Sequence, residues 1–583
     1  MKRFIYPLVF FVMVAVTPFR LLAQSNTLVI YATPVTPENT LDSVVAVDQH
    51  SGSPHAIYQL VSTDTPYVYD NTIVVDNNVS FIGVPAASDG RLPCIQPNIH
   101  TDATIQGHMF AFTKAGSVVK LQNLYLLGIS TDNTVDLGDG FGVSVNADNI
   151  KCYIDNVVFE QWTQFSINFQ GAWDSFWITN CKFRNSVNSG SMYTGEAFRM
   201  RNDLGTRLVD TVVMKYNTFL AVNAYAFCVP VVGTMNYGEF SHNSVVCMVK
   251  NPFFSMPATN LKIEHNIFYA TYTGGMANGE YPWWDRIWSP GVGSTIDFDT
   301  LSIVNAVNAG IDTTKADWSA TAEAARKIDV NDNIYFRPQA FTDFYTAWND
   351  TAHGLDSIYT TEWMNDLTTS MFSNKTRWPG FNDNGNLVGT DPGYGSGITN
   401  MIGGSGVTVP PEDGAGMIPY IAAARANNGV ANVDFSFAQS KPDYSSGNWV
   451  PTWPLPEAND LKYSANLTAT DGKPYGDPYW FNGITGVEKN PGQLPGKFSL
   501  SEAYPNPFNP STNIKFTISE AGNVSLKVYN TLGQLVKTIV NNEYKQSGEY
   551  DLRVDMSKFA SGIYLYRLEE GNNAITKKMI LLK

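Results

Sequence analysis

The stretch FWITNCKFRN, residues 176–185, contains the spacing that decides the fold. Three of its residues, Ile178, Cys181 and Phe183, stand at positions i, i+3 and i+5. The same spacing recurs in five other segments: Ile154/Val157/Phe159, Met214/Asn217/Phe219, Phe240/Asn243/Val245, Ile263/Asn266/Phe268 and Val330/Asn333/Tyr335. A shorter form occurs upstream, in Val79/Phe81 and Leu124/Leu126. This recurrence predicts a structural repeat in which these residues point inward.

The distances between repeats indicate a solenoid. The last members of successive segments are 45, 33, 24, 36, 26, 23 and 67 residues apart. One coil of a solenoid with parallel strands about 4.8 Å apart takes about 24 residues. Longer steps predict coils that carry loops, and the step of 67 predicts two coils with an insertion. We therefore expect an all-β fold, a right-handed parallel β-helix. The alternative, a β-sandwich with Asn in its turns, has no reason to keep one spacing through so many segments.

Asparagine recurs at the corner of the repeat. Asn tolerates the left-handed backbone conformation, and its amide can bond to the Asn of the next coil. One group stands just before the inward slot: Asn78, Asn123, Asn156 and Asn180. A second group occupies that slot: Asn217, Asn243, Asn266 and Asn333. An unpaired amide there would cost about 1–3 kcal/mol, so the run predicts a hydrogen-bonded ladder.

The chain begins with the features of a secretion signal, residues 1–23. Lys2 and Arg3 form a basic end, Ile5 to Val16 is an apolar stretch, and cleavage is predicted after Ala23. The apolar stretch is too short to span a bilayer, and no other segment is long and apolar enough. We expect an exported chain with no transmembrane segment after cleavage.

Three further regions follow the signal. Residues 24–483 are predicted to form the β-helix domain, with strand-like TLVIYATPV and SVVAV in an N-terminal cap and coils from about Thr72 to Pro338. A tail, residues 340–483, is expected to fold back on the coils, because its many Trp and Tyr residues imply packing. Short helices are predicted at Asp317–Lys327 and Ile418–Arg425. A linker with Gly and Pro, residues 484–497, precedes a small β-sandwich at 498–583.

Charge and cysteine content exclude several classes. The whole chain carries −15, the signal +3 and residues 498–583 +2, which leaves −20 on residues 24–497. That balance argues against a nucleic-acid partner. The five cysteines are Cys94, Cys152, Cys181, Cys228 and Cys247. We interpret them as small buried hydrophobic residues rather than a disulfide framework or a metal site.

The last 86 residues contain recognisable motifs. YPNPFNPST stands at 504–512, Gly533 lies in a turn between predicted strands, and Ser561-Gly562-Ile563-Tyr564 precedes a basic final strand. This region resembles the type A C-terminal sorting domain of the type IX secretion system in Bacteroidetes-like bacteria. The resemblance implies passage through the outer membrane by the secretion machinery. It also implies a secreted or cell-surface location. The alternative is an ordinary immunoglobulin-like module of the protein itself.

The repeat region, roughly residues 50–480, resembles the right-handed parallel β-helix of the pectate-lyase-like superfamily. Asp391-Pro392-Gly393-Tyr394 and the GDPYW segment resemble the closing part of such domains. That superfamily includes polysaccharide lyases, glycoside hydrolases, epimerases and adhesins, so the fold alone does not select an activity. The vWiDH-like and Arg-x-Pro-x-x-Arg signatures of pectate lyases are missing. The Asp-Asp and Gly-His-Gly pairs of polygalacturonases are missing too.

The resemblance implies which side chains a lyase would need. Pectate lyases of this shape hold Ca²⁺ against the uronate with carboxylates and use Arg or Lys to take the C5 proton. The candidate catalytic residues are Lys182, Arg184, Arg199 and Arg201, which the repeat places outward. The candidate calcium ligands are Asp136, Asp139, Asp155 and Glu160, since Ca²⁺ prefers several converging oxygens. No other cofactor is expected. The alternative is a set of salt bridges between coils on a solvated face.

Two further groups have two interpretations each. His242 and His265 occupy the same slot of consecutive coils and should stack, either as a corner ladder or as metal ligands. Trp283, Trp284 and Trp288 could bind sugar rings by stacking, or could pin a loop to the solenoid.

The leading hypothesis is a secreted or cell-surface protein that binds or acts on extracellular polysaccharide, as a lyase or hydrolase of acidic glycans. The rival hypothesis is a non-catalytic adhesin or a structural, filament-forming protein that self-associates.

Overall fold

The computed structural model describes residues 26–32, 39–99, 107–131, 140–200, 208–228, 234–254, 258–277, 293–308, 310–350, 357–361, 363–403, 416–433, 435, 453–458, 460–463, 467–480, 499–503, 505–518, 522–545, 548–570 and 573–582. The predicted signal peptide lies outside these residues. The chain divides into two compact units, residues 1–487 and 488–583, and each is described by itself.

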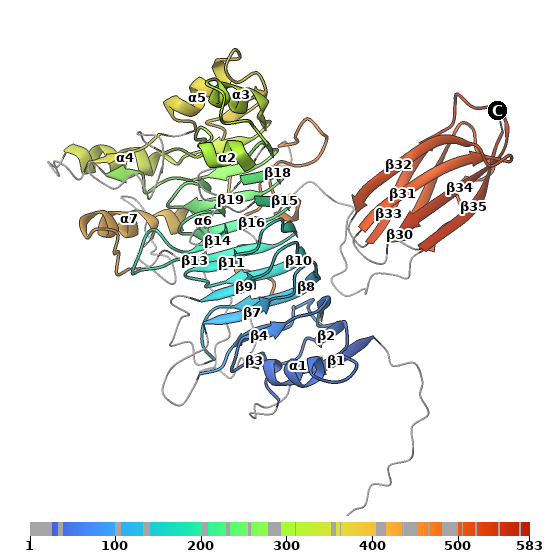
Figure 1. Cartoon of the computed structure of the whole chain (residues 1–583), viewed down its shortest axis with the longest axis horizontal. Coiled ribbons are helices and arrows are strands. Elements are labelled where there is room, and N and C mark those ends of the chain that lie inside the picture. Colours follow the sequence, from blue (N-terminus) through green and yellow to red (C-terminus); the bar gives the residue numbers. More distant parts are fainter. Residues whose placement is uncertain are drawn as a thin grey trace, which may run out of the picture. The chain divides into compact units, whose positions relative to one another are not determined.

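In the first unit, three columns of parallel strands stack along one axis, as in a β-helix (Figure 1). The first wall consists of β1 (Thr27–Tyr31), β2 (Ile57–Val61), β5 (Val79–Val84), β8 (Val118–Leu127), β10 (Lys151–Glu160), β12 (Ser175–Thr179), β15 (Leu208–Lys215), β18 (Thr234–Ser241), β21 (Asn260–Glu264), β24 (Lys327–Asn331) and β27 (Phe381–Asn382). The predicted all-β solenoid is confirmed.

The second wall adjoins the first, because β8 and β10 bend at a corner and continue into it. Its other strands are β3 (Tyr67–Tyr69), β6 (Cys94–Pro97), β13 (Lys182–Ser186), β16 (Thr218–Val222), β19 (Ser244–Met248), β22 (Ile267–Tyr269), β25 (Ile334–Phe336) and β28 (Leu387–Val388). The third wall consists of β4 (Ile73–Val75), β7 (His108–Phe112), β9 (Phe141–Val145), β11 (Phe165–Phe169), β14 (Glu196–Met200), β17 (Phe227–Cys228) and β20 (Phe253–Phe254).

The residues of the repeat fill the shaft between the walls. Ile178, Cys181 and Phe183 are completely buried, and the five matching segments belong to the same core. Phe183 stacks between Phe159 and Phe219, with ring centroids 4.9 Å apart on either side and planes within 3° of parallel. The coil spacing therefore sets the ring spacing. All five cysteines are buried and free, as predicted.

The asparagine ladder forms as predicted and is longer than predicted. Asn217 donates its Nδ2 to Oδ1 of Asn243 at 2.9 Å, and Asn243 donates to Asn266 at 3.1 Å. The ladder continues through Asn333 and ends at Asn386. Each Oδ1 also accepts the backbone N–H of the preceding rung.

The corner residue just before the inward slot has a left-handed backbone in successive coils. Asn123, Asn156 and Asn180 adopt it with φ of 51–56°. In the later coils the same place is taken by Tyr216, His242, His265 and Asp332, with φ of 53–62°. The corner is thus a column that runs along the solenoid, and its later members are not asparagine.

Three details of the prediction are wrong. Asn266 bonds directly to Asn333 and β21 pairs with β24, so the step of 67 is one coil with a long insertion. The coils do not end near Pro338, because β27 and β28 add one more, and β1 and β2 already pair in parallel before Thr72. The segment SVVAV is not a strand but lies in helix α1 (Leu41–Gln49).

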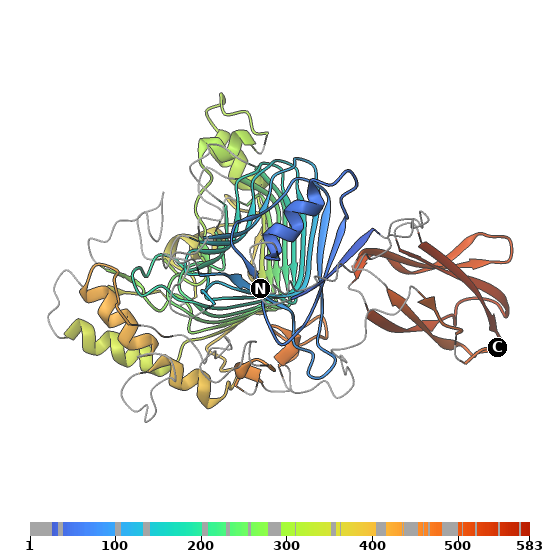
Figure 2. The same ribbon diagram turned by 90° about the horizontal axis from the view of Figure 1, so that it is seen from below.

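Helix α1 closes the N-terminal end of the shaft. Its Leu41 and Val45, four residues apart on one helical face, are buried in the shaft core. Figure 2 shows this blue helix across the end of the stack. A helix serves here because an end cap must cover apolar shaft without offering another unpaired strand edge.

The remaining helices lie outside the coils. Two of them match the predicted helices, α3 (Trp318–Ala325) and α7 (Met417–Ala426). The others are α2 (Ile303–Asn308), α4 (Gln339–Asp350), α5 (Asp366–Ser373) and α6 (Ser396–Ile402). A short antiparallel pair joins β23 (Met276–Ala277) to β26 (Ile358–Tyr359), and 3₁₀ turns occupy Pro456–Ala458 and Pro478–Trp480.

A second hydrophobic core covers the outer face of the second wall. Leu220, Val246, Ile267 and Ile334 occupy outward positions of β16, β19, β22 and β25, and all are completely buried. They pack in one cluster with side chains of α4, α6 and α7 and of residues 461–463 and 467–480. Figure 1 shows α4, α6 and α7 on one side of the stacked strands.

The second unit is a small antiparallel β-sandwich. One sheet contains β29 (Ser499–Leu500), β30 (Ser511–Ile518) and β33 (Gly548–Asp555). The other contains β32 (Leu535–Lys545), β31 (Gly522–Asn530), β34 (Gly562–Glu570) and β35 (Asn573–Leu581). Buried residues of both sheets form a separate core.

Candidate functional site

Arg184 and Glu160 stack on neighbouring strands of the second wall, as the register predicts, but they are buried. Nη1 of Arg184 lies 2.5 Å from Oε2 of Glu160. The same guanidinium contacts Glu457 with two nitrogens, at 2.9 and 2.7 Å. All three side chains are at most 1% exposed. Since the guanidinium is enclosed by two carboxylates, the group is a structural ion network rather than a binding surface.

Lys182 is also covered. Its Nζ lies 2.5 Å from Oδ2 of Asp477, which also accepts the Thr218 hydroxyl at 2.7 Å. The rings of Tyr479 and Trp480 cover the ammonium group, with centroids 4.8 and 5.6 Å away. We name residues 467–480 the closing segment, because they cover this part of the second wall. The predicted groove at Lys182 and Arg184 is therefore filled by the chain itself.

The predicted calcium ligands do not converge among the described residues. Asp155 accepts hydrogen bonds from Thr179 and Asn180 of the next coil, at 2.8 and 2.7 Å. Glu160 is engaged with Arg184 and with Asn185. Asp136 and Asp139 lie outside the described residues, as do Arg201, Trp283, Trp284 and Trp288.

Arg199 lies on β14 in the third wall, and the structure does not bring it together with Lys182 and Arg184 of the second wall. Its neighbours Phe198 and Met200 are inward, as predicted. Nη1 of Arg199 lies 2.7 Å from Oε1 of Glu196, and the guanidinium lies 4.8 Å from the Phe165 ring centroid. The Arg199 side chain is 31% exposed. Three of the four predicted catalytic residues are described by the structure, and among these Arg199 is the most exposed to solvent.

Buried polar atoms without partners surround this ion pair. The strand register aligns Ser144, Asn168, Arg199 and Cys228 on successive coils of the third wall. Asn168 is completely buried, yet neither its Oδ1 nor its Nδ2 has a hydrogen-bond partner among the described residues. The same holds for Ser166 Oγ, whereas the Glu196 carboxyl group also faces the Cys228 thiol. An unsatisfied buried polar atom costs about 1–3 kcal/mol, so the third wall keeps these polar side chains here at a cost to stability.

Glu196 has an unusual acidity. Burial raises its pKa to about 7, although the charge of Arg199 acts in the opposite direction. The pKa of Arg199 is raised by the Glu196 carboxylate. A carboxyl group that titrates near neutral pH is suited to proton transfer, and such groups concentrate at functional sites. We name Ser166, Asn168, Glu196 and Arg199 the third-wall site.

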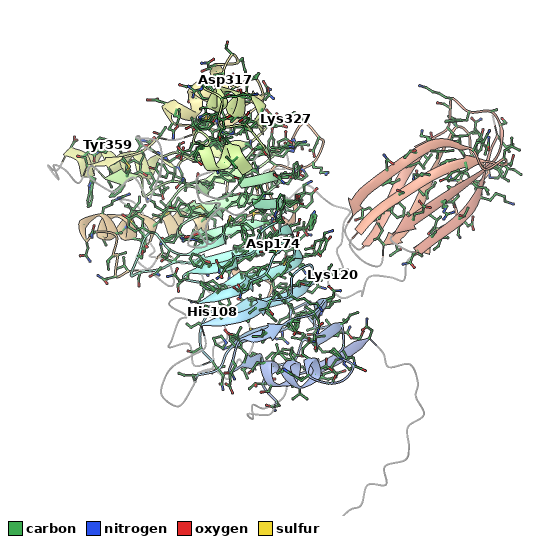
Figure 3. The ribbon with its side chains drawn as sticks, in the orientation of Figure 1. His108, Lys120, Asp174, Asp317, Lys327 and Tyr359 are labelled. Atoms are coloured by element: carbon green, nitrogen blue, oxygen red, sulfur yellow. The ribbon has the colours of Figure 1, made fainter. Side chains whose placement is uncertain are left out.

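A row of aromatic rings leads to this site along the same wall. The His108 ring stacks on Phe141 at 4.4 Å, and Phe141 stacks on Phe165 at 5.2 Å between centroids. All three residues are partly exposed, and Arg199 caps the row at Phe165. Figure 3 labels His108, on the opposite edge of the stack from Lys120 of the first wall in that view.

His242 and His265 stack as predicted, with ring centroids 4.7 Å apart and planes inclined by 29°. Each adopts the left-handed corner conformation. Asp471 of the closing segment approaches both, and the three side chains offer ligand atoms that all lie within 4.8 Å of one another. Among the described residues, His242, His265 and Asp471 form the one group of three or more His, Cys, Asp or Glu side chains that lie close enough to share a metal ion.

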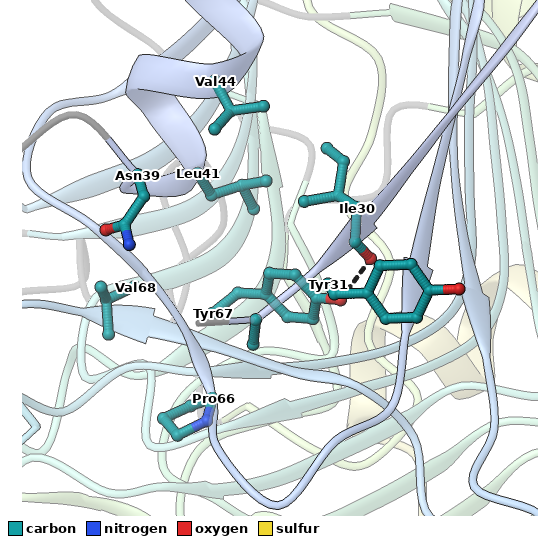
Figure 4. A pocket seen from close by; sticks show the side chains of 9 residues that line it. Ile30, Tyr31, Asn39, Leu41, Val44, Pro66, Tyr67 and Val68 are labelled. Carbon is teal, nitrogen blue, oxygen red and sulfur yellow. Dashed lines mark hydrogen bonds between the residues drawn. The ribbon is translucent and has the colours of Figure 1, made fainter. Parts of the chain in front are cut away.

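A cavity near the N-terminal cap does not fit a sugar chain. It lies between β1, α1 and β3, is lined by Ile30, Leu41, Val44 and Val68 among others, and holds about 70 Å³ (Figure 4). Tyr67 crosses it and donates its hydroxyl to the carbonyl of Ile30 at 2.7 Å. Ligand pockets usually have a volume of about 300–1,000 Å³, so we interpret this one as a packing gap beneath the cap.

Sequence reasoning missed Ser166, Asn168 and the role of Glu196. The signal available was Glu196 itself, which shares one strand with two arginines in EAFRMR. A second signal was missed on the other wall. On the two coils that follow, the outward residues in register with Arg184 are Leu220 and Val246, and such apolar residues in outward positions indicate a covered face.

Comparison with known families and proteins gives one match. Residues 502–582 match the family described as "Secretion system C-terminal sorting domain". The comparison with curated proteins and that with solved structures found no match. In the part of the chain that the structure describes, no helix has the length and apolar character to cross a bilayer. Residues 502–582 are thus a type IX secretion C-terminal sorting domain, which implies contact with the secretion machinery and export to the cell surface or beyond.

Proposed function

We propose that the solenoid binds an acidic extracellular polysaccharide at the third-wall site, with Arg199 as the residue that contacts the sugar carboxylate. The observation that carries this proposal is the pairing of a partly exposed guanidinium with a buried carboxyl group on one strand. A guanidinium presents paired N–H donors that match a carboxylate. The sorting domain supports the proposal, since it implies that the solenoid is exported to the cell surface or beyond.

Glu196 is the positioning residue in this arrangement. It holds Arg199 through the 2.7 Å ion pair, and at 1% exposure it does not face solvent. Asn168, in register with Arg199 on the neighbouring coil, is completely buried and lies behind the proposed contact surface. Rings His108, Phe141 and Phe165 extend the surface along the solenoid axis, in the direction a polymer would follow.

Cleavage is the finer form of this proposal. In a lyase reaction a base removes the proton at C5 of a uronate and the C4–O4 bond breaks. A C4=C5 double bond forms, and the glycosidic oxygen leaves with a proton. In this reaction Arg199, which stays protonated beside Glu196, would bind the uronate carboxylate and stabilise the charge that develops at C5, while the base that takes the C5 proton lies outside this ion pair. Calcium binding by Asp136, Asp139, Asp155 and Glu160 and sugar stacking on Trp283, Trp284 and Trp288 stay predictions.

The test compares Arg199→Ala with Lys215→Ala in the full chain. Lys215 is a matched control because it is equally exposed, at 32%, and lies 2.6 Å from the carboxylate of Glu239. A charge-assisted contact contributes about 1.5–3 kcal/mol, so Arg199→Ala should weaken binding to a uronate polymer by about 10- to 100-fold. Lys215→Ala should bind the uronate polymer as tightly as the unaltered protein does. Neither substitution should change the binding of a neutral polymer, which is the control ligand.

The same samples decide between the two functional hypotheses. Unsaturated ends absorb in the ultraviolet and reducing ends are detected chemically, with calcium and with a chelator. Product release that is lost in Arg199→Ala supports a lyase or hydrolase. Binding without product supports the non-catalytic adhesin. Equal affinity of Arg199→Ala and the unaltered protein would contradict the third-wall site.

A further inference from the structure

In consecutive coils, the corner column between the first and second walls carries side chains of types that can bind a metal ion. Tyr216, His242, His265 and Asp332 follow one another in the same left-handed corner position. Because the coils stack in parallel register, the side chains are one strand spacing apart. Two imidazoles and a carboxylate therefore form a row, and the closing segment lies against it.

Each ring nitrogen of His242 faces a hydrogen-bond acceptor. Nδ1 lies 2.8 Å from the carbonyl oxygen of Pro474, which can only accept, so Nδ1 carries a proton. Nε2 lies 3.1 Å from Oδ2 of Asp471. In a neutral ring the lone pair of Nε2 would then face a lone pair of the Asp471 carboxylate. The contact requires a cation, either a proton or a metal ion.

His265 adds a second imidazole to the same place. Its Nε2 lies 3.5 Å from Oδ2 of Asp332, whose two oxygens also accept hydrogen bonds from Thr470 N–H and the Tyr475 hydroxyl. Burial lowers the pKa of His242, while the Pro474 carbonyl and Asp471 act in the opposite direction. Lys473 lies on the outer side, 3.8 Å from Asp471 and bonded to the Tyr216 hydroxyl at 3.0 Å.

We propose that His242, His265 and Asp471 form a site for a first-row divalent metal ion, zinc by its preference for imidazole and carboxylate ligands, which fastens the closing segment to the solenoid. Two His and one Asp supply three protein ligands, and water or Asp332 supplies the fourth. The Pro474 carbonyl fixes the His242 tautomer from behind, as carbonyls do for metal-bound histidines. Binding requires the His265 ring to turn from its stacking on His242.

The site would act as a clamp between parts of the chain that are far apart in sequence. Asp471 is 229 residues from His242 along the chain. The same closing segment supplies Asp477 and Trp480, which cover the second wall next to the clamp. A metal ion that binds only the folded chain stabilises it by mass action. Hard Ca²⁺, which prefers oxygen ligands, should not compete.

The test is titration of the chelator-treated full chain with Co²⁺, followed by Zn²⁺. We expect about one equivalent of Co²⁺ with the intense visible absorption of a tetrahedral site, displaced by Zn²⁺ and unaffected by millimolar Ca²⁺. Asp471→Asn keeps the shape of the side chain and should weaken Co²⁺ binding at least tenfold, as should His265→Gln. His55→Gln is the matched control, since His55 pairs with Asp48 far from this corner, at 2.6 Å.

A second readout follows the clamp itself. Bound Zn²⁺ should slow proteolysis of the closing segment in the unaltered chain and not in Asp471→Asn. If His265→Gln does not fold, the comparison of Co²⁺ binding by the unaltered chain and by Asp471→Asn still tests the proposal. Absence of Co²⁺ binding would overturn the proposal, as would equal binding by Asp471→Asn. Nitrogen NMR that shows both His242 nitrogens protonated at neutral pH and unchanged by Zn²⁺ would identify a proton as the cation and also overturn it.

Discussion

Arg184 and Arg199 show how the wall that carries a residue decides its chemistry. Both point outward from a strand, and both pair with a glutamate. Arg184 lies on a face that the tail covers, where Glu457 pairs with it and apolar side chains pack on the later coils. Arg199 lies on the third wall and keeps 31% of its side chain exposed. One side chain therefore supports the fold, and the other is available to a ligand.

The stacked phenylalanines should make a large contribution to stability. Phe183→Ala removes the middle ring of the Phe159–Phe183–Phe219 stack and leaves a cavity that rigid neighbours cannot fill. We expect a loss of about 3–5 kcal/mol in the free energy of unfolding. Chemical denaturation of the full chain, followed at the solenoid transition, measures it. Val74→Ala, at a 53% exposed position, should change stability by less than about 0.5 kcal/mol. A loss below about 1 kcal/mol for Phe183→Ala would show that the ring is not enclosed.

The acidity of Glu196 should make stability depend on pH. Its pKa is raised from 4.5 in the unfolded chain to about 7 in the folded protein. The folded chain therefore binds a proton that the unfolded chain has already released, and stability falls as pH rises from 4.5 to 7. The loss should approach about 3 kcal/mol, at about 1.4 kcal/mol for each unit.

Glu196→Gln, which cannot titrate, isolates this contribution. Relative to the unaltered protein, its unfolding free energy should decline less over the same pH range. Identical pH profiles for the two proteins would mean that Glu196 keeps an ordinary pKa. Arg199→Gln should shift the profile to higher pH, since Arg199 lowers the pKa of Glu196.

At the scale of elements, two adjacent residues at the corner of each coil have separate structural roles. The left-handed residue turns the chain, and the next residue, Asn in the later coils, carries the amide ladder inside. Because the amide makes the bonds and the preceding residue makes the turn, the turning position is free to vary. That freedom allows Tyr216, His242, His265 and Asp332 to occupy it.

Breaking the ladder in its middle should cost more than breaking it at its end. Asn243→Ala removes the buried acceptor of the Asn217 backbone and side-chain N–H groups and one of the donors to Asn266. Each orphaned group costs about 1–3 kcal/mol, so we expect a loss of about 2–5 kcal/mol. Asn386→Ala, at the half-buried end, removes the acceptor of the Asn333 N–H groups but no donor to a further asparagine, so it should cost about half as much. Equal denaturation midpoints for the two variants would contradict a ladder held together by its neighbours.

At the scale of the whole molecule, the proposed binding site and the sorting domain belong to separate units. The solenoid and its tail form one compact unit, and the sorting sandwich has its own core. A chain that stops at residue 487 should fold, keep its affinity for the glycan and remain inside the outer membrane of a type IX-secreting cell. Fractionation of cells that express the two lengths measures this. Export of the shortened chain would show that residues 488–583 are not required for sorting.

The sequence by itself determined the solenoid, its inward residues, the asparagine ladder and the sorting sandwich. These depend on spacing along one strand and on the register between consecutive coils, which are local in sequence. It also placed Arg199 outward and His242 over His265. Only the tertiary structure decided that Glu457 and Asp477 cover Arg184 and Lys182, across 273 and 295 residues of chain. The contacts of the tail depend on where a long irregular segment returns, and no periodic pattern encodes that. The choice between a buried ion network and an exposed site was therefore made by the fold of the tail.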